Sequence, residues 1–220
     1  MLTLGIDDAG RGPVVGPMII GGCLIDEKLE DEFKKLGVKD SKQLTDKRRE
    51  FLADIVRQKA IAFDFVVITA EEIDSCNAAG VNLNQLEAIK MAEIINRVNK
   101  GFTKMKVVVD CPSVSIAPWR DYLKTKINEL HNLDVVCEHK ADVNHVSVSA
   151  ASIIAKSTRE KEMAKIREKY PEVGSGYTSD PLTQRFLEKN AKKFEEAGIF
   201  RKSWETWKTC ITKLGQRTLE

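Results

Sequence analysis

The order of the apolar segments constrains the fold of this chain more than any other feature of the sequence. Two strand-like segments stand close together at the N-terminus, and helical and strand-like segments alternate after them. Two adjacent strands imply a hairpin, and after a third strand the alternation of helices and strands supplies the crossover connections that parallel strands need. We therefore predict an α/β protein in which helices cover a mixed sheet.

Hydrophobic periodicity and the residues that begin or end helices give the expected elements. The predicted strands are 2–6, 18–25, 60–68, 104–110 and 133–138. The predicted helices are 27–36, one beginning near residue 45, one beginning at the capping-box residues 69–72, one ending near residue 100, 118–130, 146–170 and most of the chain after the loop 174–177.

Composition is that of an ordinary globular protein, with 42% hydrophobic and 31% charged residues in 220. The absence of a long apolar stretch and of a basic leader leads us to expect a cytoplasmic protein without a membrane span. The five cysteines are scattered and never spaced as CxxC, so disulfides and thiolate metal sites are not expected. A net charge of +2 says little about partners, but residues 181–220 contain nine Lys/Arg against five Asp/Glu. This excess suits either a polyanionic partner or a solvated helical surface.

Acidic residues stand where three of the predicted strands end. Asp7 and Asp8 follow the first strand, Asp110 closes the fourth, and Asp142 comes shortly after the fifth. Functional groups gather beyond the carboxyl ends of strands in open α/β sheets, although a single Asp there is often only a cap or turn residue. Four carboxylates in one pocket repel one another unless cations neutralise them. Hard oxygen ligands suit two Mg²⁺ or Mn²⁺ ions and phosphoryl chemistry.

The first pair of acids imposes a geometric condition. Neighbouring strand residues face opposite sides of a sheet, so Asp7 and Asp8 can serve one site only if Asp8 already lies in the turn. Gly10 and Gly12 relax the backbone there, and Arg11 adds a cation where the chain can approach a phosphate closely. The loop is neither GxGxxG nor GxxxxGK[ST], so dinucleotide and P-loop binding are disfavoured.

Other polar residues have weaker functional interpretations. Lys42 and Lys156 are candidate phosphate contacts, and Tyr177, behind a glycine loop, could stack on a sugar or base or pack on the core. His139 and His145 lack the further ligands of a zinc site. Serines 147, 149 and 152 fit small-residue packing better than nucleophilic catalysis, because no GxSxG elbow is present.

Together these residues resemble the type 2 ribonuclease H family (ribonuclease HII), especially its archaeal single-subunit members. The matching stretches occur in family order and span most of the chain: 5–13, 38–44, 109–110, 138–142, 149–156 and 174–181. The resemblance implies a ribonuclease H-like fold with a five-stranded mixed sheet, a catalytic domain over 1–180, a helical extension over 181–220 and a monomer.

The resemblance also implies an activity. The family hydrolyses RNA paired to DNA, cuts 5′ of single ribonucleotides in duplex DNA, and leaves 3′-hydroxyl and 5′-phosphate ends. Matched by position, Asp7, Asp8, Asp110 and Asp142 would be the catalytic, metal-binding acids. The substrate contacts would be Gly10, Arg11, Gly12, Lys42, Lys156 and Tyr177.

Three places depart from the family pattern. Asp8 stands where relatives usually have Glu, so its contact with metal could become water-mediated. The segment after Asp142 lacks an aromatic-Pro pair, which leaves its loop shape open. The tail 216–220 resembles the start of a sliding-clamp docking peptide without its terminal aromatic residues, and a truncated peptide and a polar helix end are equal alternatives.

Two other function classes compete with the nuclease. A nucleic-acid-binding module would bind hybrids with a strong salt dependence and leave them intact. A metal-dependent phosphohydrolase of small molecules would release phosphate from nucleotides. The full set of acids disfavours the first class, and the lack of a phosphoryl-accepting motif disfavours the second.

Overall fold

The computed structural model describes residues 1–38, 44–101 and 103–216. The described strands are β1 (Leu2–Ala9), β2 (Met18–Ile25), β3 (Ala62–Ile68), β4 (Met105–Asp110) and β5 (Leu133–Glu138). The described helices are α1 (Glu27–Leu36), α2 (Asp46–Lys59), α3 (Ala70–Ala78), α4 (Leu83–Val98), α5 (Ile116–Lys124), α6 (Ala141–Asn144), α7 (Val146–Lys169), α8 (Pro181–Asn190) and α9 (Glu205–Gln216).

The five strands form one mixed sheet in the order β3-β2-β1-β4-β5. β1 and β2 pair antiparallel, which confirms the predicted hairpin. β4 pairs parallel with β1, and β5 pairs parallel with β4, so the carboxyl ends of these three strands meet at one edge. The predicted five-stranded mixed sheet is confirmed.

Most element boundaries agree with the sequence prediction, and two differ in an informative way. β1 continues through Ala9 rather than ending at Ile6, because its residues as far as Ala9 still pair with β2. The predicted helix 118–130 is instead Ile116–Lys124. Its end tightens into turns, since the N–H of Lys126 bonds the carbonyl of Leu123 and the N–H of Asn128 bonds the Asn96 side chain.

The described chain forms two compact units. Unit 1 consists of Met1–Ala9, Ile19–Val66 and Leu83–Thr158, and unit 2 consists of Gly10–Met18, Val67–Asn82 and Arg159–Glu220. The division into a catalytic domain 1–180 and an extension 181–220 stays a prediction. None of the helices that the structure describes combines the length and apolar character needed to cross a membrane.

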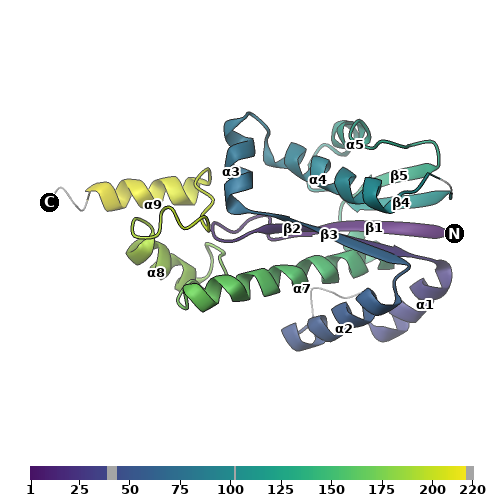
Figure 1. Ribbon diagram of the computed structural model, residues 1–220, viewed down its shortest axis with the longest axis horizontal. Helices are drawn as coiled ribbons and strands as arrows, with labels where there is room; N and C mark the ends of the chain where they lie inside the picture. The colour runs from purple at the N-terminus through teal and green to yellow at the C-terminus, as the bar shows by residue number, and fades with distance from the viewer. Residues whose placement is uncertain (39–43, 102, 217–220) are drawn as a thin grey trace. The chain divides into compact units, whose positions relative to one another are not determined.

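Helices cover both faces of the sheet in unit 1, with α4 and α5 on one face and α1, α2 and the first half of α7 on the other (Figure 1). Adjacent glycines of β2 mark the two faces. A Cβ on Gly21 would lie 2.6 Å from the carbonyl oxygen of Ala151 in α7, whereas one on Gly22 would lie 2.5 Å from Ile94 in α4. The small residues of α7 therefore pack directly on the sheet.

The closest approach is at Gly5 in β1. A Cβ there would lie 2.1 Å from the backbone of Ser147, the second residue of α7. The chain therefore needs glycine at this position for a steric reason, because no strand side chain fits beneath the helix.

We predict that Gly5→Ala lowers the free energy of unfolding by about 3 kcal/mol, because α7 must move away from β1. Gly215→Ala is the matched control. It places the same methyl group in α9, where a Cβ meets nothing within 4 Å, and should stabilise the helix by up to about 1 kcal/mol. Chemical denaturation of both variants measures the difference, and equal stabilities would contradict the prediction.

Candidate metal centre

Asp7 enters the interface between β1 and α7. It lies two residues after Gly5 and so shares the face that α7 covers. Its side chain is only 5% exposed and hydrogen-bonds with Ser152, in the second turn of α7. The small-residue start of α7 thus brings a hydroxyl to a buried carboxylate.

Asp110 and Asp142 reach the same place from neighbouring elements. Asp110 is the last residue of β4, whose carboxyl end lies beside that of β1 because the two strands are parallel. The backbone N–H of Ala141 donates to Asp110 Oδ1 at 3.1 Å, which ties the start of α6 to β4. Asp142, the next residue, is 4% exposed.

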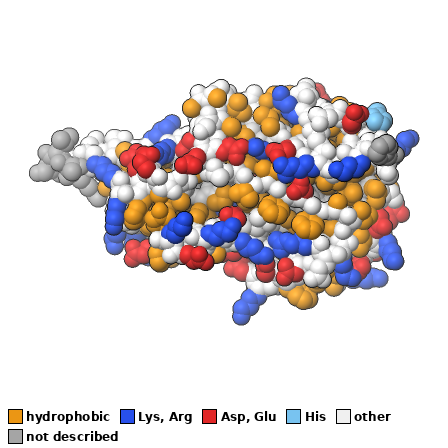
Figure 2. Space-filling view, in the orientation of Figure 1, with side chains coloured by type: hydrophobic (Ala, Val, Ile, Leu, Met, Phe, Trp, Pro, Cys, Tyr) orange, Lys and Arg blue, Asp and Glu red, His pale blue; other side chains and the backbone are white. Residues whose placement is uncertain are grey.

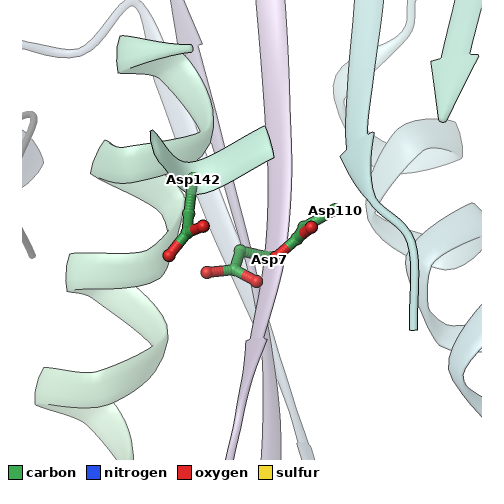
Figure 3. Close-up of side chains that lie close together, drawn as sticks. All are labelled: Asp7, Asp110 and Asp142. Atoms are coloured by element: carbon green, nitrogen blue, oxygen red, sulfur yellow. The ribbon is translucent and has the colours of Figure 1, made fainter. Parts of the chain in front are cut away.

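The three side chains converge as expected for a metal centre. One carboxylate oxygen from each of Asp7, Asp110 and Asp142 lies within 4.8 Å of the others. Figure 3 shows Asp7 between the other two, with Asp142 carried by the short helix and Asp110 by the strand end. Among the described residues, this is the sole group of three or more potential metal ligands from His, Cys, Asp and Glu.

The carboxylate cluster is electrostatically unfavourable without a cation. Burial raises the pKa of Asp7 well above its usual range, and the neighbouring charges of Asp8 and Asp110 raise it further. The hydrogen bonds from Ser152 and from the Asp8 N–H lower this pKa but do not cancel the rise. A divalent cation would supply the missing positive charge, so the donor set fits Mg²⁺ or Mn²⁺.

Asp8 is placed differently from the sequence expectation. The condition set for a shared site, that Asp8 lies in the turn, is not met, because Asp8 is within β1 and pairs with Ile20 of β2. Strand alternation gives its side chain the face opposite to that of Asp7. Asp8 is not one of the three clustered acids, although its charge acts on Asp7. Its role as a fourth ligand stays a prediction.

The segment after β5 is held by the two histidines considered for zinc. His139 Nδ1 lies 3.2 Å from the carbonyl oxygen of Cys111, and His145 Nε2 lies 2.7 Å from Glu138 Oε1. Lys140, between them, has a φ of 58°, a left-handed backbone conformation that is unusual for a residue other than glycine. Residues 141–144, between these contacts, form α6, the local shape that the sequence left open, and α6 carries Asp142.

Phosphate contacts by Lys42 and Lys156 stay predictions. Lys156 lies on α7, one helical turn after Ser152 and therefore on the side of the helix that meets Asp7. Lys42 lies outside the described residues. The hydroxyl of Ser149 donates to the carbonyl of Val38, where the matching 38–44 stretch begins.

In unit 2, residues 10–16, here called the glycine loop, lie beside residues 174–177, here called the tyrosine loop. The N–H groups of Val14 and Val15 donate to the carbonyl of Gly176 at 3.0 and 3.3 Å. Tyr177 is 38% exposed, so it is not tucked into the core.

Two buried arginines that the sequence analysis missed complete this region. The guanidinium of Arg159 lies 5.0 Å from the centre of the Tyr177 ring and donates to the carbonyl of Ser175. Arg201 is fully buried and donates to three carbonyls of the glycine loop. Arg159 follows Lys156 by three residues on the same predicted helix, and this spacing could have indicated it. Arg201 stands between Phe200 and Lys202 outside any recognised motif, so no signal in the sequence pointed to it.

Comparison with known proteins agrees with the geometry. The family model described as Ribonuclease HII matches residues 4–207. A ribonuclease HII of Methanobrevibacter smithii is 42% identical over 209 residues, 94% of this chain and 96% of the relative. The crystal structure of the ribonuclease H2 from Pyrococcus horikoshii OT3 superposes with a TM-score of 0.86 at 38% identity, covering 97% of this chain and 98% of that one. A structure of the PCNA:RNase HII complex from Archaeoglobus fulgidus gives a TM-score of 0.82 at 36% identity, covering 93% and 96%.

The buried charge gives a prediction for the metal-free protein. The folded-state pKa of Asp7 is raised, so the protonated carboxyl adds to the free energy of unfolding below about pH 4. This contribution is lost as the pH rises through the folded-state pKa. Asp7→Asn imitates the protonated form, so it should raise the Tm at neutral pH by about 2–4 °C for each kcal/mol relieved.

Added Mn²⁺ separates this effect from general stabilisation. It should raise the Tm of the wild type, through binding to the folded state, and leave that of Asp7→Asn unchanged. Asp134→Asn, at an exposed acid of β5, is the control and should behave as the wild type. Thermal melts with EDTA and with Mn²⁺ measure both effects, and an Asp7→Asn protein less stable than the wild type in EDTA would contradict the prediction.

Proposed function

Because the chain belongs to the ribonuclease HII family and is a metal-dependent ribonuclease acting on RNA/DNA hybrids, we propose that it also cuts 5′ of single ribonucleotides embedded in duplex DNA. The convergence of Asp7, Asp110 and Asp142 supports the metal-dependent chemistry of this proposal, since bound cations would relieve the repulsion between these carboxylates. The reaction breaks the bond between phosphorus and the 3′-oxygen of the preceding nucleotide. Its products carry 3′-hydroxyl and 5′-phosphate ends.

The acids would hold two divalent ions, Mg²⁺ or Mn²⁺. When bound, such a pair supplies an activated water and stabilises the charge of the leaving oxygen. Asp7, which lies between the other two carboxylates, would hold the ions together with Asp110 and Asp142. Ser152 and the Ala141 N–H orient Asp7 and Asp110. Asp8 would act as a fourth ligand through water, because its side chain is short and begins on the other face of β1.

Substrate recognition would use the glycine and tyrosine loops. The backbone of Gly10, Arg11 and Gly12 would read the 2′-hydroxyl, the group that distinguishes RNA from DNA at one position. Gly12 is exposed, and a Cβ on it would meet nothing within 4 Å, so a nucleic acid could approach its backbone closely. Tyr177 would stack on the adjoining sugar, and Lys42 and Lys156 would contact phosphates.

The charge distribution is compatible with such a local site rather than a broad electrostatic one. Figure 2 shows blue and red side chains interspersed over the visible face, consistent with a net charge of only +2. Because the net charge is only +2, recognition is expected to rest on contacts at the ribonucleotide more than on general electrostatic attraction.

The test is cleavage of a labelled DNA duplex that carries one ribonucleotide, with Mg²⁺ or Mn²⁺. We expect a cut on the 5′ side of the ribonucleotide and no cut in the all-DNA duplex. Asp110→Asn should reduce the rate by at least about 100-fold and remain folded, because only the charge of a ligand changes. Asp134→Asn should keep the wild-type rate.

The outcomes separate the competing functions. A protein that binds the duplex without cutting would be a binding module, and one that releases phosphate only from nucleotides would be a small-molecule phosphohydrolase. Full activity of Asp110→Asn would show that Asp110 is not a ligand.

We further propose that the chain contacts a sliding clamp through its tail and otherwise acts as a monomer. The complex of the Archaeoglobus fulgidus relative with PCNA supports the contact. The tail residues 217–220 lie outside the described residues, and α9 runs to Gln216 immediately before them.

Removal of residues 217–220 tests the tail directly. Binding of the full chain to an archaeal clamp, measured by calorimetry, should be lost in the truncated chain, while cleavage of the ribonucleotide duplex without clamp stays unchanged. Equal clamp binding by both forms would contradict the role of the tail.

A further inference from the structure

The glycine loop is held from one side by the guanidinium of Arg201. Its Nη2 donates to the carbonyl of Gly10 at 2.6 Å, its Nη1 to that of Arg11 at 2.7 Å, and its Nε to that of Gly16 at 3.1 Å. The planar guanidinium has a fixed set of donors, so these three bonds fix the carbonyls relative to one another.

The arginine is itself immobilised. It is 0% exposed, and its guanidinium lies 5.1 Å from the centre of the Trp204 ring. Its backbone N–H donates to the carbonyl of Val14 at 2.9 Å, next to an antiparallel bridge between Val15 and Phe200. The N–H groups of Lys202 and Ser203 donate to Asp74 in α3, which anchors the chain just after Arg201.

The direction of the carbonyls determines the direction of the neighbouring N–H groups. In a planar trans peptide the C=O and the N–H of the next residue point opposite ways, and no peptide of the described chain is cis. The Gly10 carbonyl pointing at Arg201 therefore turns the N–H of Arg11 away from the guanidinium. The Arg11 carbonyl does the same for the N–H of Gly12, at the open face of the loop.

We propose that Arg201 is a positioning residue for ribonucleotide selection, which aims the N–H groups of Arg11 and Gly12 at the 2′-hydroxyl. This proposal rests on the proposed function, in which the glycine loop reads that group. Successive N–H groups fixed in one direction form a concave donor site for an oxygen atom, and their preorganisation removes the cost of ordering the loop on binding. Arg201 itself does not touch the substrate.

The test compares binding of two duplexes by the full chain in EDTA, which prevents cleavage. The duplexes are identical except that one carries a single ribonucleotide, and fluorescence anisotropy gives both Kd values. We expect the wild type to prefer the ribonucleotide duplex. Arg201→Lys keeps the charge but loses the planar set of donors. The ratio of the two Kd values should therefore fall roughly 10-fold, while the affinity for the all-DNA duplex stays unchanged.

Phe194→Leu provides the control for loss of stability in unit 2. Its ring packs on Tyr170 at 4.9 Å and borders the apolar cluster that contains Val14 and Val15, but no described ring pair or hydrogen bond joins it to Gly10, Arg11 or Gly12. A purely structural role for Arg201 would lower the Tm in both variants and leave the preference intact in both. Retained preference in a folded Arg201→Lys protein therefore overturns the proposal.

Two further results complete the test. If the wild type shows no preference, recognition of the 2′-hydroxyl by the glycine loop fails, and the positioning role fails with it. If Arg201→Lys does not fold, amide hydrogen exchange of the wild type decides. The N–H groups of Arg11 and Gly12 should exchange more slowly with the ribonucleotide duplex than with the all-DNA duplex, and equal exchange overturns the proposal.

Discussion

Helix α7 can lie directly on the sheet of unit 1 because Gly5 and Gly21 have no side chain. Their hypothetical Cβ atoms would fall 2.1 and 2.6 Å from the helix backbone, which is far inside van der Waals contact. The small residues at the start of α7 allow the same close approach from the helix side. Because Asp7 follows Gly5 on the same face, the tight packing also encloses its carboxylate and brings Ser152 to it. The convergence of the three carboxylates therefore depends on a steric fit that involves no charged group.

The same enclosure makes the metal-free site unfavourable. Three carboxylates with oxygens within 4.8 Å of one another, two of them almost fully buried, repel and are poorly hydrated. Ordinary selection for stability would remove such a cluster, and its presence is consistent with a functional demand met by cations. The backbone donor at Ala141 and the hydroxyl of Ser152 fix the directions of two carboxylates before any ion arrives. Such preorganisation is what a hydrolytic metal site requires.

In unit 2, hydrogen bonds orient the backbone of the glycine loop, as hydrogen bonds in unit 1 orient the acidic side chains. The glycine loop gains freedom from residues without side chains, and a buried side chain from a distant part of the chain then restricts that freedom. A flexible loop could adopt many orientations of its N–H groups, whereas one tied to Arg201 presents a defined set. Arg159 performs a related task for the tyrosine loop, through Ser175 and the ring of Tyr177.

The mixed sheet, the hairpin at its N-terminus and the three acids that converge could be predicted from the sequence alone. These follow from local pattern, because strands, helix caps and strand-end aspartates are set by residues close together in the chain. The sequence could not determine that β1 extends past Asp8, since pairing with β2 rather than local propensity keeps these residues extended. Nor could it identify Arg201, whose three carbonyl partners lie more than 180 residues away in the chain. Such contacts depend on how distant segments fold together, because hydrogen-bond partners are chosen by proximity in space and no periodicity or spacing in the sequence indicates it.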